Sequence, residues 1–126
     1  MSKHKILLVE DEPLISKVIT LTLSKAGYEI DSYQDGQKGL DALIDNSDYY
    51  NLVILDRTLP SLDGMDFIQA MRHNGMIESV PVIMLTADDK SETIIDAIEA
   101  GAIDYLTKPV KSNDLLALVQ RFLPQE

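Results

Sequence analysis

Three short segments of the chain consist almost entirely of apolar residues, and two others mix apolar with polar positions. The apolar segments are residues 6–9, 52–55 and 80–85. Runs of this length, rich in Val and Ile, are typical of strands buried on both faces of a parallel sheet. Residues 28–33 and 103–107 are half polar, which is typical of strands at the edge of a sheet. The pattern therefore predicts three central strands and two edge strands.

Five segments have the apolar spacing of amphipathic helices. The first begins at Pro13, which suits the first turn of a helix, and one of its faces carries Leu14, Val18 and Leu21. The other helices are expected over about 36–46, from Asp63-Gly64 to before Asn74, from near Ser91 to Gly101, and after a cap at Ser112 or Asn113. Strands and helices therefore alternate along the whole chain.

Strict alternation with short connections predicts a parallel sheet covered on both faces by right-handed crossovers. We expect a doubly wound α/β domain with a flavodoxin-like, five-stranded sheet in the order 2-1-3-4-5, because the apolar strands must be internal and the half-polar ones must be edges. Residues 1–126 are expected to form one domain, with no effector domain present.

Composition excludes several classes of protein. Of 126 residues, 45% are hydrophobic and 25% are charged, as in ordinary globular domains. The formal charge is −10 without a basic arm or stripe, so direct binding to nucleic acid or to a membrane is not expected. With no cysteine, the chain has no disulfides and no thiolate site. No apolar run suits a signal peptide or a membrane span, and we expect a cytoplasmic protein.

Chemically useful side chains follow the strands at the edge where ligands bind in this fold. They are Glu10, Asp11, Asp56, Thr86 and Lys108. Carboxylates placed close together repel each other unless a cation joins them, and Mg²⁺ suits oxygen ligands while keeping waters that a phosphate can replace. Asp56 ends a buried strand and is the candidate nucleophile, because carboxylates can accept phosphoryl groups.

Four motifs, in this order and at this spacing, resemble the receiver domain of bacterial two-component response regulators. They are LLVEDEP at 7–13, LVILDRTLPSLDG at 52–64, VIMLTA at 82–87 and GAIDYLTKP at 101–109. Each is weak alone, but the set is highly specific and covers nearly the whole chain. The resemblance implies that Asp56 is the phosphoacceptor. It also implies that Asp11 and Asp56 bind Mg²⁺ directly, Glu10 through water, and Thr58 through its backbone carbonyl.

The resemblance also implies a switch. Thr86 would be the hydroxyl that bonds the phosphoryl oxygen, Lys108 would pair with the same group, and Tyr105 would be the aromatic side chain that turns inward. Pro109 would follow a cis peptide bond. Departures are mild: the acidic pair is Glu-Asp rather than Asp-Asp, and the residue after the acceptor is Arg57. Thr58 and Asp88 stand at the two positions that tune the lifetime of the phosphoryl group in receivers.

The function implied is signal transduction in a phosphorelay. The partners would be a histidine kinase or a histidine phosphotransfer protein and an unidentified downstream effector, with a homodimer as a further option. Such a domain assists its own phosphorylation and dephosphorylation but is not an enzyme, and it changes the surface formed by the fourth helix, fifth strand and fifth helix. The chain would be either a stand-alone receiver or one domain of a longer regulator.

Other interpretations account for less of the sequence. A flavodoxin needs a hydroxyl- and glycine-rich loop where Glu10, Asp11 and Glu12 stand, and a haloacid-dehalogenase-type phosphatase needs a second Asp where Thr58 stands. A receiver-like docking module that is never phosphorylated remains the alternative. His4 and His73 receive no role. A solvated acidic face is expected from Asp88, Asp89, Glu92, Asp96, Glu99 and Asp104.

Overall fold

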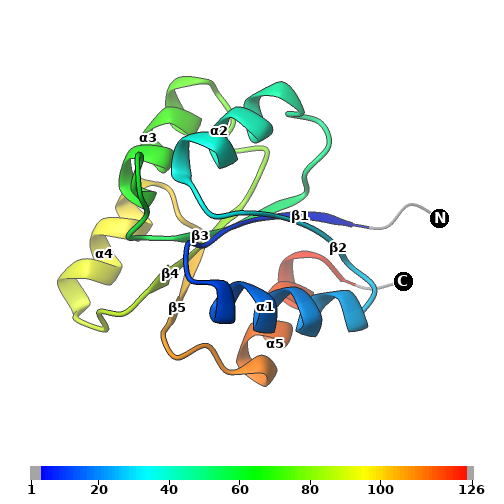
Figure 1. Cartoon of the computed structure of the whole chain (residues 1–126). Helices are drawn as coiled ribbons and strands as arrows, with labels where there is room; N and C mark the ends of the chain where they lie inside the picture. The colour runs from blue at the N-terminus through cyan, green and yellow to red at the C-terminus, as the bar shows by residue number, and fades with distance from the viewer. Residues whose placement is uncertain (1–3, 125–126) are drawn as a thin grey trace.

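The computed structural model describes residues 4–124, and its five strands form one parallel sheet. The strands are β1 (Lys5–Val9), β2 (Glu29–Tyr33), β3 (Leu52–Asp56), β4 (Val82–Thr86) and β5 (Asp104–Thr107). Their order is β2-β1-β3-β4-β5, and every neighbouring pair is parallel (Figure 1). The predicted fold class and strand order are confirmed, including the half-polar strands at the two edges.

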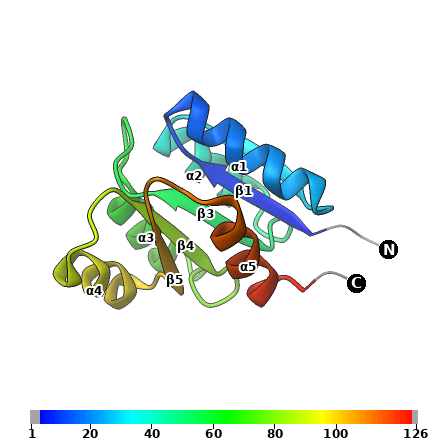
Figure 2. The ribbon, with the colours of Figure 1, turned by 90° about the horizontal axis from the view of Figure 1, so that it is seen from below.

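Five helices cover the two faces of the sheet over the described residues. They are α1 (Pro13–Lys25), α2 (Gly36–Asp45), α3 (Gly64–His73), α4 (Ser91–Ala100) and α5 (Ser112–Phe122). Helices α2, α3 and α4 lie on one face, and α1 and α5 lie on the other (Figures 1 and 2). This three-layer arrangement buries both faces of the central strands, which explains why those strands are apolar throughout.

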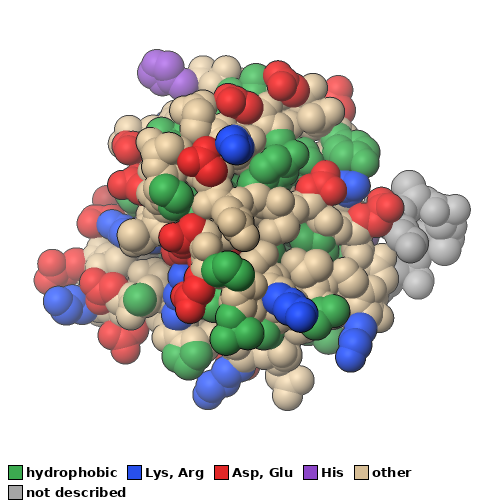
Figure 3. Space-filling view, viewed as in Figure 1, with side chains coloured by type: hydrophobic (Ala, Val, Ile, Leu, Met, Phe, Trp, Pro, Cys, Tyr) green, Lys and Arg blue, Asp and Glu red, His purple; other side chains and the backbone are tan. Residues whose placement is uncertain are grey.

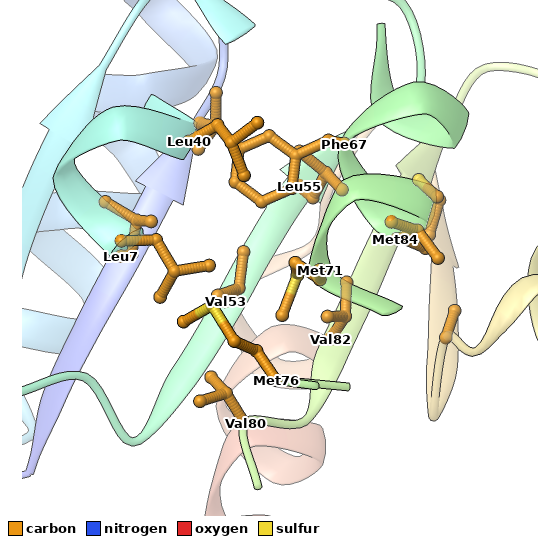
Figure 4. Packing of buried hydrophobic residues seen from close by; sticks show 14 of the residues in the cluster. Leu7, Leu40, Val53, Leu55, Phe67, Met71, Met76, Val80, Val82 and Met84 are labelled. Atoms are coloured by element: carbon orange, nitrogen blue, oxygen red, sulfur yellow. The ribbon is translucent and has the colours of Figure 1, made fainter. Parts of the chain in front are cut away.

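The apolar core is divided by the sheet into two clusters. On one face, Leu7, Val53 and Leu55 pack against Phe67 and Met71 of α3 (Figure 4). On the other face, the neighbouring strand positions contact α1 and α5; this second cluster includes Ile6, Leu8, Ile54, Ile19 and Leu115. Successive strand side chains point to opposite faces, so each central strand contributes to both clusters.

The apolar face that the sequence indicates on α1 is not the face that packs. The side chains exposed there, at 69%, 37% and 51%, are Leu14, Val18 and Leu21. The helix instead buries Ser16, Ile19 and Leu23 against the sheet. Burial of a serine is tolerated because its hydroxyl lies 2.8 Å from that of Ser32 on β2. Because the packed face carries a polar residue, the spacing of hydrophobic residues along the sequence does not identify it.

The starts of helix α5 and strand β4 also differ from the sequence prediction. Helix α5 has Lys111 at its N-cap and no side-chain cap, so the expected cap at Ser112 or Asn113 is wrong. The Ser112 hydroxyl lies 3.2 Å from that of Thr22 in α1 instead. Strand β4 begins two residues later than predicted, because the Val80 N–H donates to the Met76 carbonyl in a turn at 3.0 Å.

Candidate functional site

The carboxyl ends of the strands bring the predicted acidic residues together. Glu10 directly follows β1, and Asp56 is the last residue of β3, which pairs with β1 on one side and β4 on the other. Carboxylate oxygens of Glu10, Asp11 and Asp56 all lie within 4.8 Å of one another. Glu10 and Asp56 are buried, whereas Asp11 is exposed at the mouth of the cluster. The convergence expected from the sequence is therefore present.

Lys108 supplies the positive charge in this cluster. Its Nζ lies 3.0 Å from Oδ2 of Asp56 and 3.0 Å from Oε1 of Glu10. Its backbone N–H donates to the Thr86 carbonyl at 2.8 Å, and its peptide bond to Pro109 is cis, as the family resemblance implies. Burial alone would lower the pKa of Lys108, but the two carboxylates outweigh it and raise this pKa. Lys108 therefore stays protonated.

Glu10 is the most strained ionisable group of the cluster. Burial is the main cause that raises the pKa of Glu10 to about 7. The N–H of Glu12 donates to Oε2 of Glu10 at 3.0 Å, and this hydrogen bond lowers the same pKa. Asp56 raises the pKa further, and Lys108 lowers it. The second oxygen, Oε1, is buried and receives no well-aligned hydrogen bond from the described residues, although the ammonium is near. One ammonium does not balance three carboxylates, so the cluster has surplus negative charge.

The unsatisfied oxygen and the surplus charge fit a bound Mg²⁺. All the available ligands are hard oxygens, and Mg²⁺ commonly uses a few carboxylates and keeps several waters. The Thr58 N–H donates to Oδ1 of Asp56 at 3.2 Å, which folds the loop after β3 back beside the carboxylate. The carbonyl of Thr58 as a metal ligand remains a prediction, as do the ligand roles of the three acids.

Thr86 and Tyr105 are the two residues to which the family resemblance assigns a switch. Thr86 ends β4 and is buried; its hydroxyl accepts from the Asp88 N–H at 3.1 Å and donates to the Asp88 carbonyl at 3.3 Å. Tyr105 lies on β5 beside Met84 of β4 and is partly buried against the apolar cluster. The Thr86 hydroxyl is thus engaged by the loop after β4, and the switching roles stay predictions.

The loop that follows β3 is braced by the start of α2. Ser61 has a φ of 64°, and its hydroxyl donates to Asp35 at 2.6 Å and accepts from the Gln37 N–H at 3.2 Å. A Cβ at Gly36 would lie 1.8 Å from the carbonyl oxygen of Leu62, so only glycine fits there. This contact ties the segment that carries Thr58 to the rest of the domain.

Sequence reasoning missed the roles of Asp88 and Arg57 in the structure. The sequence predicts a solvated acidic face that includes Asp88, but the Asp88 carboxylate accepts from the Lys90 N–H at 2.9 Å and from the Thr93 hydroxyl at 2.8 Å. These two hydrogen bonds lower the pKa of Asp88. Arg57 donates to the Thr93 carbonyl at 3.2 Å. An Asp shortly before a helix start is a local capping signal for Asp88. No local signal indicates the long-range contact of Arg57.

The remaining acidic residues of the predicted face lie at the surface. Asp89, Glu92, Asp96 and Glu99 are exposed, and Figure 3 shows acidic side chains gathered over the region of α4. Asp104 is partly buried, 3.8 Å from Arg121. His4 and His73 belong to no metal-binding group among the described residues. Within the described residues, none of the helices is sufficiently long and apolar to cross a bilayer.

Comparisons with known proteins agree with this geometry. A family model described as the response regulator receiver domain matches residues 6–120. The chain is similar to the transcriptional regulatory protein QseB of Haemophilus influenzae, with 39% identity over 119 residues, covering 94% of this chain and 52% of that protein. It is 35% identical to the response regulator ArlR of Staphylococcus aureus over 122 residues, covering 97% of this chain and 53% of ArlR. The chain thus spans about half the length of these relatives.

Solved structures show the same likeness over their whole length. A putative response regulator from Chloroflexus aurantiacus superimposes with a TM-score of 0.89 at 31% identity, covering 98% of this chain and 100% of the other. The chemotaxis response regulator CheY4 of Vibrio cholerae gives 0.88 at 29% identity, covering 96% and 99%. The resemblance therefore extends to the full arrangement of strands and helices.

Proposed function

The chain belongs to the response regulator receiver family of two-component systems, and from this premise we propose that Asp56 accepts a phosphoryl group from the phosphohistidine of a histidine kinase or a histidine phosphotransfer protein. The observation that carries the proposal is the position of Asp56. Its carboxylate is buried at a strand end, contacts the Lys108 ammonium at 3.0 Å, and has two more carboxylates within 4.8 Å. That combination supports the role of Asp56 as a nucleophile in a site whose excess negative charge favours a bound cation.

The transfer exchanges one bond for another. An oxygen of the Asp56 carboxylate attacks phosphorus, the new O–P bond forms as the P–N bond of phosphohistidine breaks, and the electron pair of the broken bond stays on the imidazole nitrogen. The phosphoryl oxygens carry the spread negative charge of the transition state, so catalysis depends on positioning and on positive charge. Lys108 is placed to pair with one of these oxygens. Hydrolysis, by attack of water on phosphorus, later restores the carboxylate.

The acidic cluster would hold Mg²⁺ through Asp11, Asp56 and, by way of water, Glu10, with the Thr58 carbonyl as a further ligand. The ion would supply charge neutralisation for the phosphoryl oxygens. Because the residues that do this belong to the receiver itself, the domain would assist its own phosphorylation and dephosphorylation without acting as an enzyme on another substrate. The proposed chemistry thus uses all three carboxylates of the cluster.

The output would be a change of surface. Thr86 would leave Asp88 and bond a phosphoryl oxygen, Tyr105 would turn inward, and the face formed by α4, β5 and α5 would change toward a downstream partner or a second copy of the chain. The name of QseB describes transcriptional regulation, which makes a DNA-binding effector outside this chain one proposed output. A cytoplasmic location follows from such a pathway.

Phosphorylation with a small donor tests the proposal directly. The domain is incubated with Mg²⁺ and acetyl phosphate, and its intact mass is measured beside that of the Asp56→Asn variant. We expect the wild-type protein to gain the mass of one phosphoryl group and the variant to gain none. A wild-type protein that stays unmodified would favour a docking module, and a phosphorylated variant would show that another residue is the acceptor.

A further inference from the structure

Helix α4 is held less by packing than the other described helices. It buries only Ala97, whereas each of the other four buries three or four residues. Its Ile95 and Ile98 are 52% and 43% exposed. The position of α4 against the sheet therefore depends strongly on polar contacts, and these become candidates for control of the helix.

Two arginines provide polar contacts to the backbone of α4. Arg72 of α3 donates to the Glu99 carbonyl at 3.3 Å, near the C-terminal end of α4. Arg57, the residue after Asp56, donates to the Thr93 carbonyl at 3.2 Å, in the first turn. Arg57 is partly buried and Arg72 is exposed. A guanidinium is always charged and has a fixed set of donors, so the more shielded contact of Arg57 is the stronger of the two.

The contact of Arg57 belongs to a network that reaches Thr86. Thr93 is held through its carbonyl by Arg57, and its hydroxyl donates to Oδ2 of Asp88 at 2.8 Å. The backbone N–H of Asp88 in turn donates to the Thr86 hydroxyl at 3.1 Å. The charge of Arg57 also attracts the Asp88 carboxylate. Two residues therefore connect the switch hydroxyl to the guanidinium next to the phosphoacceptor.

We propose that Arg57 is a positioning residue that clamps the first turn of α4 to the end of β3 and so holds the Thr86 hydroxyl on Asp88. The inference rests on the proposed function, in which Thr86 must leave Asp88 to reach a phosphoryl oxygen on Asp56. Each contact of the clamp stabilises the conformation with Thr86 turned away. Loss of the guanidinium therefore shifts the population toward the phosphorylated conformation before any phosphoryl group is present.

The test compares two variants that each remove one arginine contact to α4. Arg57→Met keeps a long side chain but removes the donors, and Arg72→Met removes the same charge from the end of α4 that is not connected to Thr86. Amide NMR spectra are recorded with and without Mg²⁺ and beryllofluoride, a phosphoryl mimic. In free Arg57→Met we expect the signals of residues 88–97 to move toward their beryllofluoride positions, and phosphorylation by acetyl phosphate to become about three to ten times faster. Arg72→Met should do neither.

A further variant tests the hydrogen-bond network between Arg57 and Thr86 at a different residue. Thr93→Val removes the hydroxyl that reaches Asp88, and we expect it to move the same signals in the same direction. Because both changes break one connection, the double variant should move them little further than Arg57→Met alone. Unmoved signals, or equal effects of the two arginine variants, would overturn the clamp.

Hydrogen exchange separates the clamp from the proposed function, because it needs no phosphoryl group. The amides of residues 94–97 donate to the carbonyls of the first turn of α4, and we expect them to exchange faster in Arg57→Met than in wild type, while Arg72→Met leaves them unchanged. Unchanged exchange in Arg57→Met overturns the clamp. A wild-type domain that never acquires a phosphoryl group overturns the proposed function instead.

Discussion

Glu10 combines complete burial with a carboxylate oxygen that lacks a well-aligned donor. Lys108 lies 3.0 Å from both Glu10 and Asp56, so one ammonium is divided between two buried acids. Burial of a charge is unfavourable unless its partners compensate fully. The clustered charges therefore lower the stability of the cation-free domain, which supports the proposed Mg²⁺ site.

Neutralisation of Glu10 should stabilise the metal-free domain at alkaline pH. Its folded pKa of about 7 lies above the ordinary value of 4.5, so folding favours the protonated form. The stabilisation from the protonated carboxyl is complete below pH 4.5 and is lost as the pH rises through 7. In Glu10→Gln this loss is absent, and we expect the variant to be more stable by about 1 to 3 kcal/mol at pH 8.

Urea unfolding in the presence of a chelator, at several pH values between 5 and 8, measures this difference. The advantage of Glu10→Gln over wild type should grow across that interval and level off above neutrality. Glu29→Gln is a matched control, because Glu29 is exposed. A constant difference across the interval, or a less stable Glu10→Gln at pH 8, would contradict the strained carboxylate.

At the scale of elements, the loops at the carboxyl edge are positioned by close backbone contacts. Helix α3 begins so near β3 that a Cβ at Gly64 would lie 2.6 Å from the Asp56 carbonyl oxygen. Gly36, at the start of α2, approaches the loop after β3 in the same way. Glycine is needed at both positions for space, because neither has a positive φ. Helix α4, in contrast, buries only Ala97 and is held by hydrogen bonds from Arg57 and Arg72.

Substitution of Gly36 should disturb the loop that carries Thr58. In Gly36→Ala the new methyl group would collide with the backbone of Leu62, which cannot move away like the end of a side chain. We expect a loss of about 2 to 3 kcal/mol in the free energy of unfolding, together with weaker Mg²⁺ binding. Urea denaturation and a Mg²⁺ titration followed by amide NMR measure the two effects.

Gly75→Ala is the control for that experiment. Gly75 has a φ of 70°, but a Cβ there would meet nothing within 4 Å. Alanine at this position should cost about 1 kcal/mol through backbone strain alone and leave Mg²⁺ binding unchanged. Equal losses in the two variants would show that the collision at Gly36 is relieved by a shift of the loop.

At the scale of the whole molecule, the acidic residues behind the formal charge of −10 fall into two groups that differ in burial and in screening by salt. Most acidic side chains, including those over α4, are exposed to solvent, where salt screens them (Figure 3). Glu10, Asp11 and Asp56 instead share one small cluster, two of them buried. Diffuse surface charge responds to any salt, whereas the cluster should respond to a divalent cation that fits it.

Mg²⁺ should therefore stabilise the domain more than NaCl of equal ionic strength. Binding to the folded state adds about 2.7 kcal/mol when Mg²⁺ exceeds its Kd a hundredfold, and the Tm rises accordingly. Asp11→Asn should remove this extra increment while keeping the response to NaCl, because Asp11 is exposed and its loss leaves the core intact. Thermal unfolding of both proteins in the two salts measures the difference.

Asp89→Asn is the matched control, because it removes an exposed acid at another place on the surface. It should keep the full Mg²⁺ increment. An increment that persists in Asp11→Asn, or that disappears equally in Asp89→Asn, would mean that Mg²⁺ acts by general screening and that the cluster is not its site.

The sequence by itself determined the sheet order and the position of the acidic cluster. Both follow from local information: continuous apolar runs must lie inside a parallel sheet, and a residue directly after a strand must lie at its carboxyl edge. Asp56 after β3 and Glu10 after β1 thus had to meet, whatever the side-chain packing. The boundaries of most helices followed from Pro13, Asp63 and Gly101 in the same local way.

Only the tertiary structure decided which surfaces pack and which polar groups find partners. The face of α1 that packs carries Ser16, whose partner lies on another element, so hydrophobic periodicity could not identify it. The network from Arg57 through Thr93 to Asp88 joins residues that are far apart in the chain or separated by a turn. The unsatisfied oxygen of Glu10 is likewise a property of everything that surrounds it. Such features depend on distances and angles between elements, and those are set only when the whole domain has folded.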